Sequence, residues 1–345
     1  RLLATLFVQL GNTYFQLQKF EIAIQNYQLA RRSLDSHTTT KRQTLHSSNN
    51  TTDAIQQQEN ESSKHTSSPI PNTSTKTKVW NLEDSILDAQ ALTNIASTHA
   101  VLQQYEQATT AYAEALKLKR HALRFSLETQ SSSSSNTKKS SPETEQTTYN
   151  DNKLVLDIAR TLHNIGLLRF HQNYYTKAQD AYKQSLALRV EKCGLDDLSV
   201  ACTLQNLGDV YFAQGDYNRA LQSYMEVLRV RKISLGSKHV LMASAHYNIG
   251  LVHYKNGPYA KARSALMEAL RIRREMLGDA HPHLASTLHS LGVLLTTMGE
   301  LDDAMRCLLG ALRIRRRVFD KKEKENVPTT TSTNNNTTTT MPDVI

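Results

Sequence analysis

The 345-residue sequence contains little cysteine and tryptophan, and it has no long apolar run. Its three cysteines, Cys193, Cys202 and Cys307, are too few and too irregularly spaced for a disulfide scaffold or a zinc site. A reduced, cytoplasmic setting follows from that. No segment approaches the roughly 20 consecutive apolar residues that a membrane-spanning helix requires. We therefore exclude a secreted disulfide-rich domain and a membrane protein.

Patterns that carry chemistry are also scarce. The glycines occur singly and form no phosphate-binding loop. His281 and His283 are the densest histidine pair, but two residues separated by one proline lack the geometry of an i, i+4 pair of helical ligands. We assign these histidines to a linker or a helix cap. No nucleophile is marked out by a partner base, so we expect no enzyme activity, no metal and no cofactor.

What the sequence does contain is a pattern that recurs every 42 residues. One column of the pattern is glycine and another is alanine, and aromatic or leucine columns keep the same interval. An internal repeat of this length is typical of stacked helical hairpins. The glycine column is Gly166, Gly208, Gly250 and Gly292, and the alanine column is Ala178, Ala220, Ala262 and Ala304.

Each copy of the pattern predicts two helices joined by a tight turn. Leu204, Leu207 and Tyr211 follow a helical period, Gly215 interrupts it, and Tyr217 resumes it. A single hairpin would leave an apolar face bare, so the copies must stack. The predicted fold is all-α, a right-handed α-solenoid of about six helix-turn-helix hairpins with disordered insertions and a disordered tail.

Weaker copies precede the four regular ones and are separated from them by polar spacers. Segments dominated by Ser, Thr, Asn and Gln bury too little apolar surface to offset the entropy of ordering. We expect a divergent hairpin at 1–35, a disordered insertion at 36–78, a hairpin at 79–127, a disordered insertion at 128–152, four consecutive hairpins at 153–326 and a disordered tail at 327–345.

These residues resemble the tetratricopeptide repeat family. The run Leu-Gln-Asn-Leu-Gly at 204–208, followed by Tyr217, Ala220 and Tyr224, is similar to the family pattern. The 42-residue period and the run Gly-Asp-Ala-His-Pro-His-Leu-Ala at 278–285 resemble the kinesin light chain type. The resemblance implies a non-catalytic interaction scaffold whose first helices line a concave groove for short extended peptides.

The resemblance also implies site residues. It places Asn94, Asn164, Asn206 and Asn248 at the first-helix position that hydrogen-bonds a peptide backbone in relatives, and an amide side chain can both donate and accept. The alternative is that these asparagines join neighbouring helices. Ser290 departs from the column. The preceding positions could select ligand side chains or form an ordinary wet surface, and they are His163, Gln205, Tyr247 and His289.

Net charge suggests the chemistry of the partner. The chain carries a formal charge of +9, most of it within residues 151–326. Arg189, Arg231, Arg273 and Arg315 end the second helices, where the helix dipole favours cations. The cluster Arg313, Arg315, Arg316 and Arg317 exceeds what a helix end needs and, with Arg273, forms a basic field that would attract acidic peptide segments.

Three readings of function remain open. The first is the protein-binding scaffold, for which the resemblance implies a motor complex as a further partner, although no apolar heptad run precedes the repeats. The second is a regulatory or sensor arm of a larger enzyme or signalling protein. The third is nucleic-acid binding, which we consider unlikely because the array lacks a recurring base-reading pair of side chains.

Overall fold

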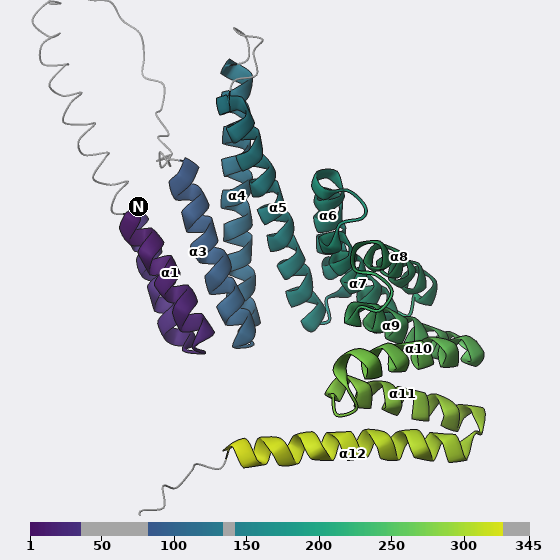
Figure 1. The fold of residues 1–345 in the computed structure, drawn as a ribbon. Helices are drawn as coiled ribbons and strands as arrows, with labels where there is room; N and C mark the ends of the chain where they lie inside the picture. Colours follow the sequence, from purple (N-terminus) through teal and green to yellow (C-terminus); the bar gives the residue numbers. More distant parts are fainter. Residues whose placement is uncertain (36–81, 134–141, 327–345) are drawn as a thin grey trace, which may run out of the picture. The chain divides into compact units, whose positions relative to one another are not determined.

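The computed structural model describes residues 1–35, 82–133 and 142–326, and every regular element in those ranges is a helix. Figure 1 shows that the two helices of a hairpin, such as α9 and α10 or α11 and α12, lie side by side. The expected all-α class of stacked hairpins is confirmed. In chain order the helices are α1 (Leu2–Gln16), residues 20–35, α3 (Leu82–Val101), α4 (Tyr105–Ser133), α5 (Pro142–His171), α6 (Tyr175–Cys193), α7 (Leu198–Ala213), α8 (Tyr217–Leu235), α9 (Val240–Asn256), α10 (Tyr259–Leu277), α11 (Pro282–Met298) and α12 (Leu301–Asn326).

Contacts between residues divide the chain into two compact units, Arg1–Glu226 and Val227–Ile345, and the division falls within α8. Each unit is a series of hairpins in which the second helix of one hairpin packs on the first helix of the next, as α4 packs on α5 and α10 on α11. The units are described separately below.

The repeated glycines allow the two helices of a hairpin to approach closely. A Cβ atom on Gly208 would lie 2.7 Å from Cε1 of Tyr224, and one on Gly250 would lie 2.7 Å from Cγ of Leu266. Real Cβ atoms do not come this close to other heavy atoms, so the column requires glycine unless the facing side chain shifts. The opposing Tyr224 and Leu266 are themselves buried, which makes this contact the centre of each hairpin.

The hairpin turns place one residue in the left-handed region. Gly215, Gly257 and Gly299 have φ of 80°, 108° and 83°. The first three hairpins use residues with a side chain at the corresponding turn, and these are Gln18, Gln103 and Asn173 with φ of 58°, 59° and 62°.

The first helices of the later hairpins begin with capped ends. Asp197 accepts a hydrogen bond from the main-chain amide of Ser199 at 2.7 Å. In the following hairpins a histidine takes this place, and Nδ1 of His281 accepts from the amide of His283 at 3.1 Å. The capping role predicted for this histidine pair is confirmed.

The disordered insertion predicted for 128–152 was wrong over most of its length. Helix α4 continues to Ser133 and α5 begins at Pro142. A polar contact joins the two helices here, since Asp151 of α5 accepts from Ser126 Oγ and from Gln130 Nε2 of α4, both at 2.6 Å. The rest of that interval, 134–141, and the segments expected to be disordered at 36–78 and 327–345 lie outside the described residues.

Candidate protein-binding surface

The asparagine column lies on the first helices of successive hairpins, and each of its members is half-buried. Asn94, Asn164 and Asn206 stand on α3, α5 and α7 in the unit Arg1–Glu226. Asn248 stands on α9 in the unit Val227–Ile345. All four asparagines therefore occupy the same position on the first helix of their hairpins.

The amides of the first unit hydrogen-bond to the preceding hairpin. Nδ2 of Asn94 donates to Oδ1 of Asn12 at 2.9 Å. Asn164 hydrogen-bonds to the side chain of Tyr112. Asn206 bonds to Nε2 of His163 at 3.1 Å and to the side chain of Tyr182. These bonds connect hairpins, which was the alternative role that the sequence left open, and an amide group retains further donor and acceptor capacity beside them.

The column that precedes the asparagines pairs with the next hairpin. The hydroxyl of Tyr247 lies 3.0 Å from that of Ser290, which is the same 43-residue step that joins His163 to Asn206. His163 also contacts Tyr182 edge-on, with ring centroids 5.4 Å apart. His289 is exposed. Two buried polar atoms in this column, Nδ1 of His163 and Oε1 of Gln205, have no hydrogen-bond partner within the described residues.

Three members of the arginine column, Arg189, Arg231 and Arg273, are buried and join hairpins. Nη1 of Arg189 donates to the main-chain oxygen of Ser199 at 2.6 Å and to Oγ1 of Thr203 at 2.7 Å. Arg231 donates to the main-chain oxygen of Leu241 at 2.8 Å. The helix dipole is thus an incomplete explanation of this column, because each guanidinium reaches the first turn of the next hairpin.

Lys119 is the corresponding cation of the α3–α4 hairpin, a residue that the sequence reading missed. Its Nζ lies 2.5 Å from Oδ2 of Asp157 on α5 and donates to Oγ1 of Thr161 at 2.8 Å. The side chain is 1% exposed. The sequence could have identified Lys119 by its spacing. It precedes Arg189 by 70 residues, the same interval that separates Ala108 from Ala178 in these two hairpins.

The predicted basic field is smaller than expected. Arg273 is 6% exposed, donates to the main-chain oxygen of His283 at 2.9 Å, and lies over the ring of Tyr247 with 4.7 Å to its centroid. Arg273 therefore does not lie on the exposed surface of the field, because the packing of α11 on α10 covers it. The remaining members of the field are exposed on α12, and they are Arg313, Arg315, Arg316 and Arg317.

Comparison with known proteins gives the family. Tetratricopeptide repeat models match residues 4–30, 89–121, 157–233 and 241–317, and a further one matches 206–275. The chain belongs to the tetratricopeptide repeat family. Such repeats are interaction modules that bind other proteins. No curated protein matches the chain.

Solved structures show the same fold. BtubC (BKLC) from P. vanneervenii matches with a TM-score of 0.53 and 20% identity, covering 68% of this chain and 83% of its own. The apo form of RapI matches with a TM-score of 0.54 and 12% identity, covering 92% and 99%. A putative kinesin light chain from Podosopora anserina is found at a TM-score of 0.46 and 16% identity, covering 66% and 98%.

Burial sets the charge state of the groups within the tetratricopeptide array. Desolvation, with a smaller contribution from Arg189, lowers the pKa of His163 to about 4, so this ring is neutral near neutral pH. Desolvation also lowers the pKa of Lys119, and the nearby Asp157 carboxylate opposes that shift. The array therefore holds buried cations beside a neutral imidazole.

A pocket of about 1020 Å³ lies along α9 and α10 of the array. Its lining includes His246 and His253 from α9, and Glu268 and Arg271 from α10. His246 occupies a column that holds leucine in the neighbouring hairpins, at Leu204 and Leu288. That departure was the sequence signal for a histidine in the lining of this pocket. Arg271 is ion-paired with Glu268 and Glu275 at 2.6 and 2.7 Å, so its charge is already matched.

Within residues 1–35, 82–133 and 142–326, no three His, Cys, Asp or Glu side chains come together in a group that could hold a metal ion. Over the same part of the chain, none of the helices combines the length and apolar character needed to traverse a bilayer.

Proposed function

We propose that the array is a scaffold that binds short extended peptide segments of partner proteins along its first helices, and that these segments are acidic. In the unit Arg1–Glu226 the binding row is Asn94, Asn164 and Asn206, with His163 and Gln205 beside it. In the unit Val227–Ile345 the corresponding residues are Asn248 and Tyr247, with His289 on the next first helix.

The observation that carries the proposal is the half-buried amide column at one fixed position of successive first helices. Because a primary amide offers two donor hydrogens and an acceptor oxygen, each can keep its link to the neighbouring hairpin and still bond to a peptide group. Main-chain recognition of this kind does not depend on the side chains of the ligand.

Unsatisfied polar atoms beside the row support the same proposal. Buried polar atoms in folded proteins nearly always have a hydrogen-bond partner, so the orphaned Oε1 of Gln205 and Nδ1 of His163 call for one. A ligand that supplied an N–H group to Gln205 would remove a desolvation cost of about 1–3 kcal/mol. The net charge of +9 favours acidic segments and speeds their encounter with the array.

The test uses the full chain and a short fluorescent peptide that carries one tryptophan among aspartate and glutamate residues. Asn206→Ala should weaken binding about 5-fold or more, since one hydrogen bond contributes about 1 kcal/mol. The matched control is Asn218→Ala, which removes an exposed asparagine from the second helix α8. Circular dichroism should show unchanged helicity in both variants.

Two results would overturn the proposal. Equal affinity for the Asn206 and Asn218 variants would remove the amide row from the binding site. A peptide with lysine in place of each acidic residue should bind far more weakly, and equal affinity for that peptide would remove the acidic specificity.

A further inference from the structure

The last described helix, α12, exposes a face that its counterpart in the preceding hairpin buries. In α10 this face contains Leu270 and Arg273: Leu270 packs against the cluster of Leu284, Ala285 and Leu288, and Arg273 bonds to α11. Forty-two residues later the same positions are Leu312, which is 62% exposed, and Arg315, which is exposed. Phe319 extends the face and is 65% exposed.

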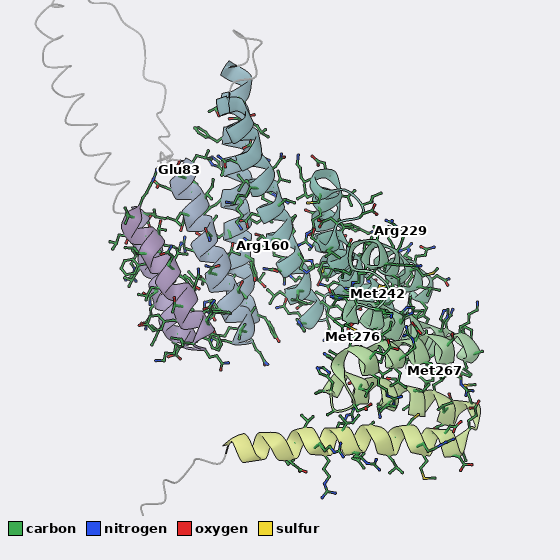
Figure 2. All side chains as sticks on the ribbon, in the orientation of Figure 1. Glu83, Arg160, Arg229, Met242, Met267 and Met276 are labelled. Carbon is green, nitrogen blue, oxygen red and sulfur yellow. The ribbon has the colours of Figure 1, made fainter. Side chains whose placement is uncertain are left out.

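The difference in side-chain exposure between α10 and α12 is confined to that face. On the outer side of the hairpins, Met267 of α10 is 51% exposed and its counterpart Leu309 is 54% exposed, so this side meets solvent in both. Figure 2 labels Met267 on α10. Only the positions that would contact a following helix change from covered to open.

The buried cation column indicates what the open face would accept. Arg189 and Arg273 each donate to a first-turn carbonyl oxygen and to a threonine hydroxyl of the helix that covers them. Lys119, at the equivalent position of α4, pairs with Asp157 and donates to the Thr161 hydroxyl, both on the covering helix α5. A helix seated on Arg315 would thus present a carbonyl oxygen with a threonine or an acidic side chain.

Charge on α12 distinguishes this face further. In α10, Arg271 is neutralised by Glu268 and Glu275. The corresponding positions of α12 are Arg313, Gly310 and Arg317, so the two carboxylates are replaced by a glycine and another cation. Arg313, Arg316 and Arg317 are all exposed. An incoming helix therefore meets several exposed arginines around an apolar centre.

We propose that the face formed by Leu312, Arg315 and Phe319 docks an acidic amphipathic helix of a partner protein. Leucine or alanine side chains of that helix cover Leu312 and Phe319. Its first turn accepts from Arg315, and its flanking carboxylates face Arg313, Arg316 and Arg317. This surface differs from the first-helix row that binds extended peptides.

Two other occupants fit the chemistry less well. Helix α1 of a second copy exposes leucines, including Leu2 at 79% and Leu6 at 53%, but it contains no acidic residue. Residues 327–345 of the chain contain no leucine and no aromatic residue. Neither combines an apolar stripe with the negative charge that the arginines favour.

The test measures binding of two synthetic peptides to the full chain by fluorescence anisotropy. The first peptide has the sequence 281–298, which contains the helix that covers α10. The second carries His283→Glu, His289→Glu and Thr297→Glu, three positions that are exposed in α11. The acidic peptide should bind more tightly, and its affinity should fall as salt increases.

Variants of the chain locate the contact. Arg315→Ala and Leu312→Ala should each weaken binding of the acidic peptide about tenfold or more, which is about 1.4 kcal/mol. The matched controls are Arg306→Ala and Leu309→Ala, exposed residues on other positions of α12. They should change the affinity less than about twofold, because they lie outside the proposed face.

Three outcomes would overturn the proposal. The control variants could weaken binding as much as Arg315→Ala does. The chain could sediment as a dimer that Leu312→Ala dissociates, which would make a second copy the occupant. The acidic peptide could bind only after deletion of residues 327–345, which would make those residues the occupant.

Discussion

The main-chain oxygen of Ser199 accepts a hydrogen bond from Nη1 of Arg189 at 2.6 Å, and this contact helps to tie the end of α6 to the start of α7. The same relationship joins Arg231 to Leu241 and Arg273 to His283. The array is thus held together by buried cations as well as by apolar packing.

Replacing the buried cation should cost much more than replacing its exposed counterpart. Arg273→Met leaves the His283 carbonyl and the Thr287 hydroxyl without their charged donor, so the free energy of unfolding should fall by about 2–3 kcal/mol. Arg315→Met, at the same position of the next hairpin, should change it by less than about 0.5 kcal/mol. Urea unfolding of both variants measures the difference, and equal midpoints would contradict the role of the column.

Removing the carboxylate that faces Lys119 should be strongly destabilising. Asp157→Asn leaves a cation that is 1% exposed without its counter-charge, and such a loss costs about 3 kcal/mol. The control is Asp303→Asn, which breaks an exposed pair with Arg306 and should cost about 0–1 kcal/mol. Thermal unfolding distinguishes the two, and a small effect of Asp157→Asn would show that the hydroxyls of Thr93 and Thr161 suffice for Lys119.

Acidification should weaken the array through His163. Its folded pKa is about 4 and the usual value is about 6.5, so between these pH values the unfolded chain binds a proton that the folded chain does not. Stability is unaffected above about pH 6.5 and falls as the pH is lowered towards 4, by about 1–2 kcal/mol after allowance for solvent screening at this half-buried ring.

The variant that checks this prediction is His163→Gln, which installs the residue that the next hairpin carries at Gln205. Unfolding curves at pH 7 and pH 4.5 should differ less for the variant than for the original chain. Identical pH dependence in the two proteins would assign the effect to other histidines, among which burial also lowers the pKa of His246 and His253.

The hairpin turns should accept glycine with a gain in stability. Gln103 adopts φ of 59°, a conformation that costs a residue with a side chain about 1–2 kcal/mol, so Gln103→Gly should stabilise the chain by about 0.5–1 kcal/mol after the entropy of glycine is subtracted. Gly257→Ala, at φ of 108°, should destabilise it by about 1–2 kcal/mol. Calorimetric midpoints that shift in the same direction for both changes would refute the argument.

Much of the fold could be predicted from the sequence because positions with a backbone constraint require a particular residue, and that residue recurs in the later repeats. Gly208 must be small to admit Tyr224, and Gly257 must tolerate a positive φ, so both recur at a fixed interval that any reader can count. The end of α4 was not predictable in this way. Its serine run carries no apolar period, and the helix is held by contacts of Asp151 from the next helix.

The candidate site could be predicted only in part, for a related reason. The position of Asn206 follows from the repeat, but its partner His163 depends on how two hairpins pack. Ser290 appeared to break the column, yet it keeps the link because the longer side chain of Tyr247 reaches it. Nothing in the sequence indicates that the long side chain of Tyr247 compensates for the short side chain of Ser290. The burial of Arg273 was likewise invisible, since an arginine at a helix end usually faces solvent.

The cations that join the hairpins bond to main-chain carbonyl oxygens, at Ser199, Leu241 and His283. Every amino acid supplies that oxygen, so the acceptor survives any substitution at these positions. A duplicated or transplanted hairpin would therefore meet a main-chain carbonyl oxygen that can accept from its cation, whatever the sequence of the neighbouring first turn. This part of the link therefore needs no matching side chain on the hairpin that follows.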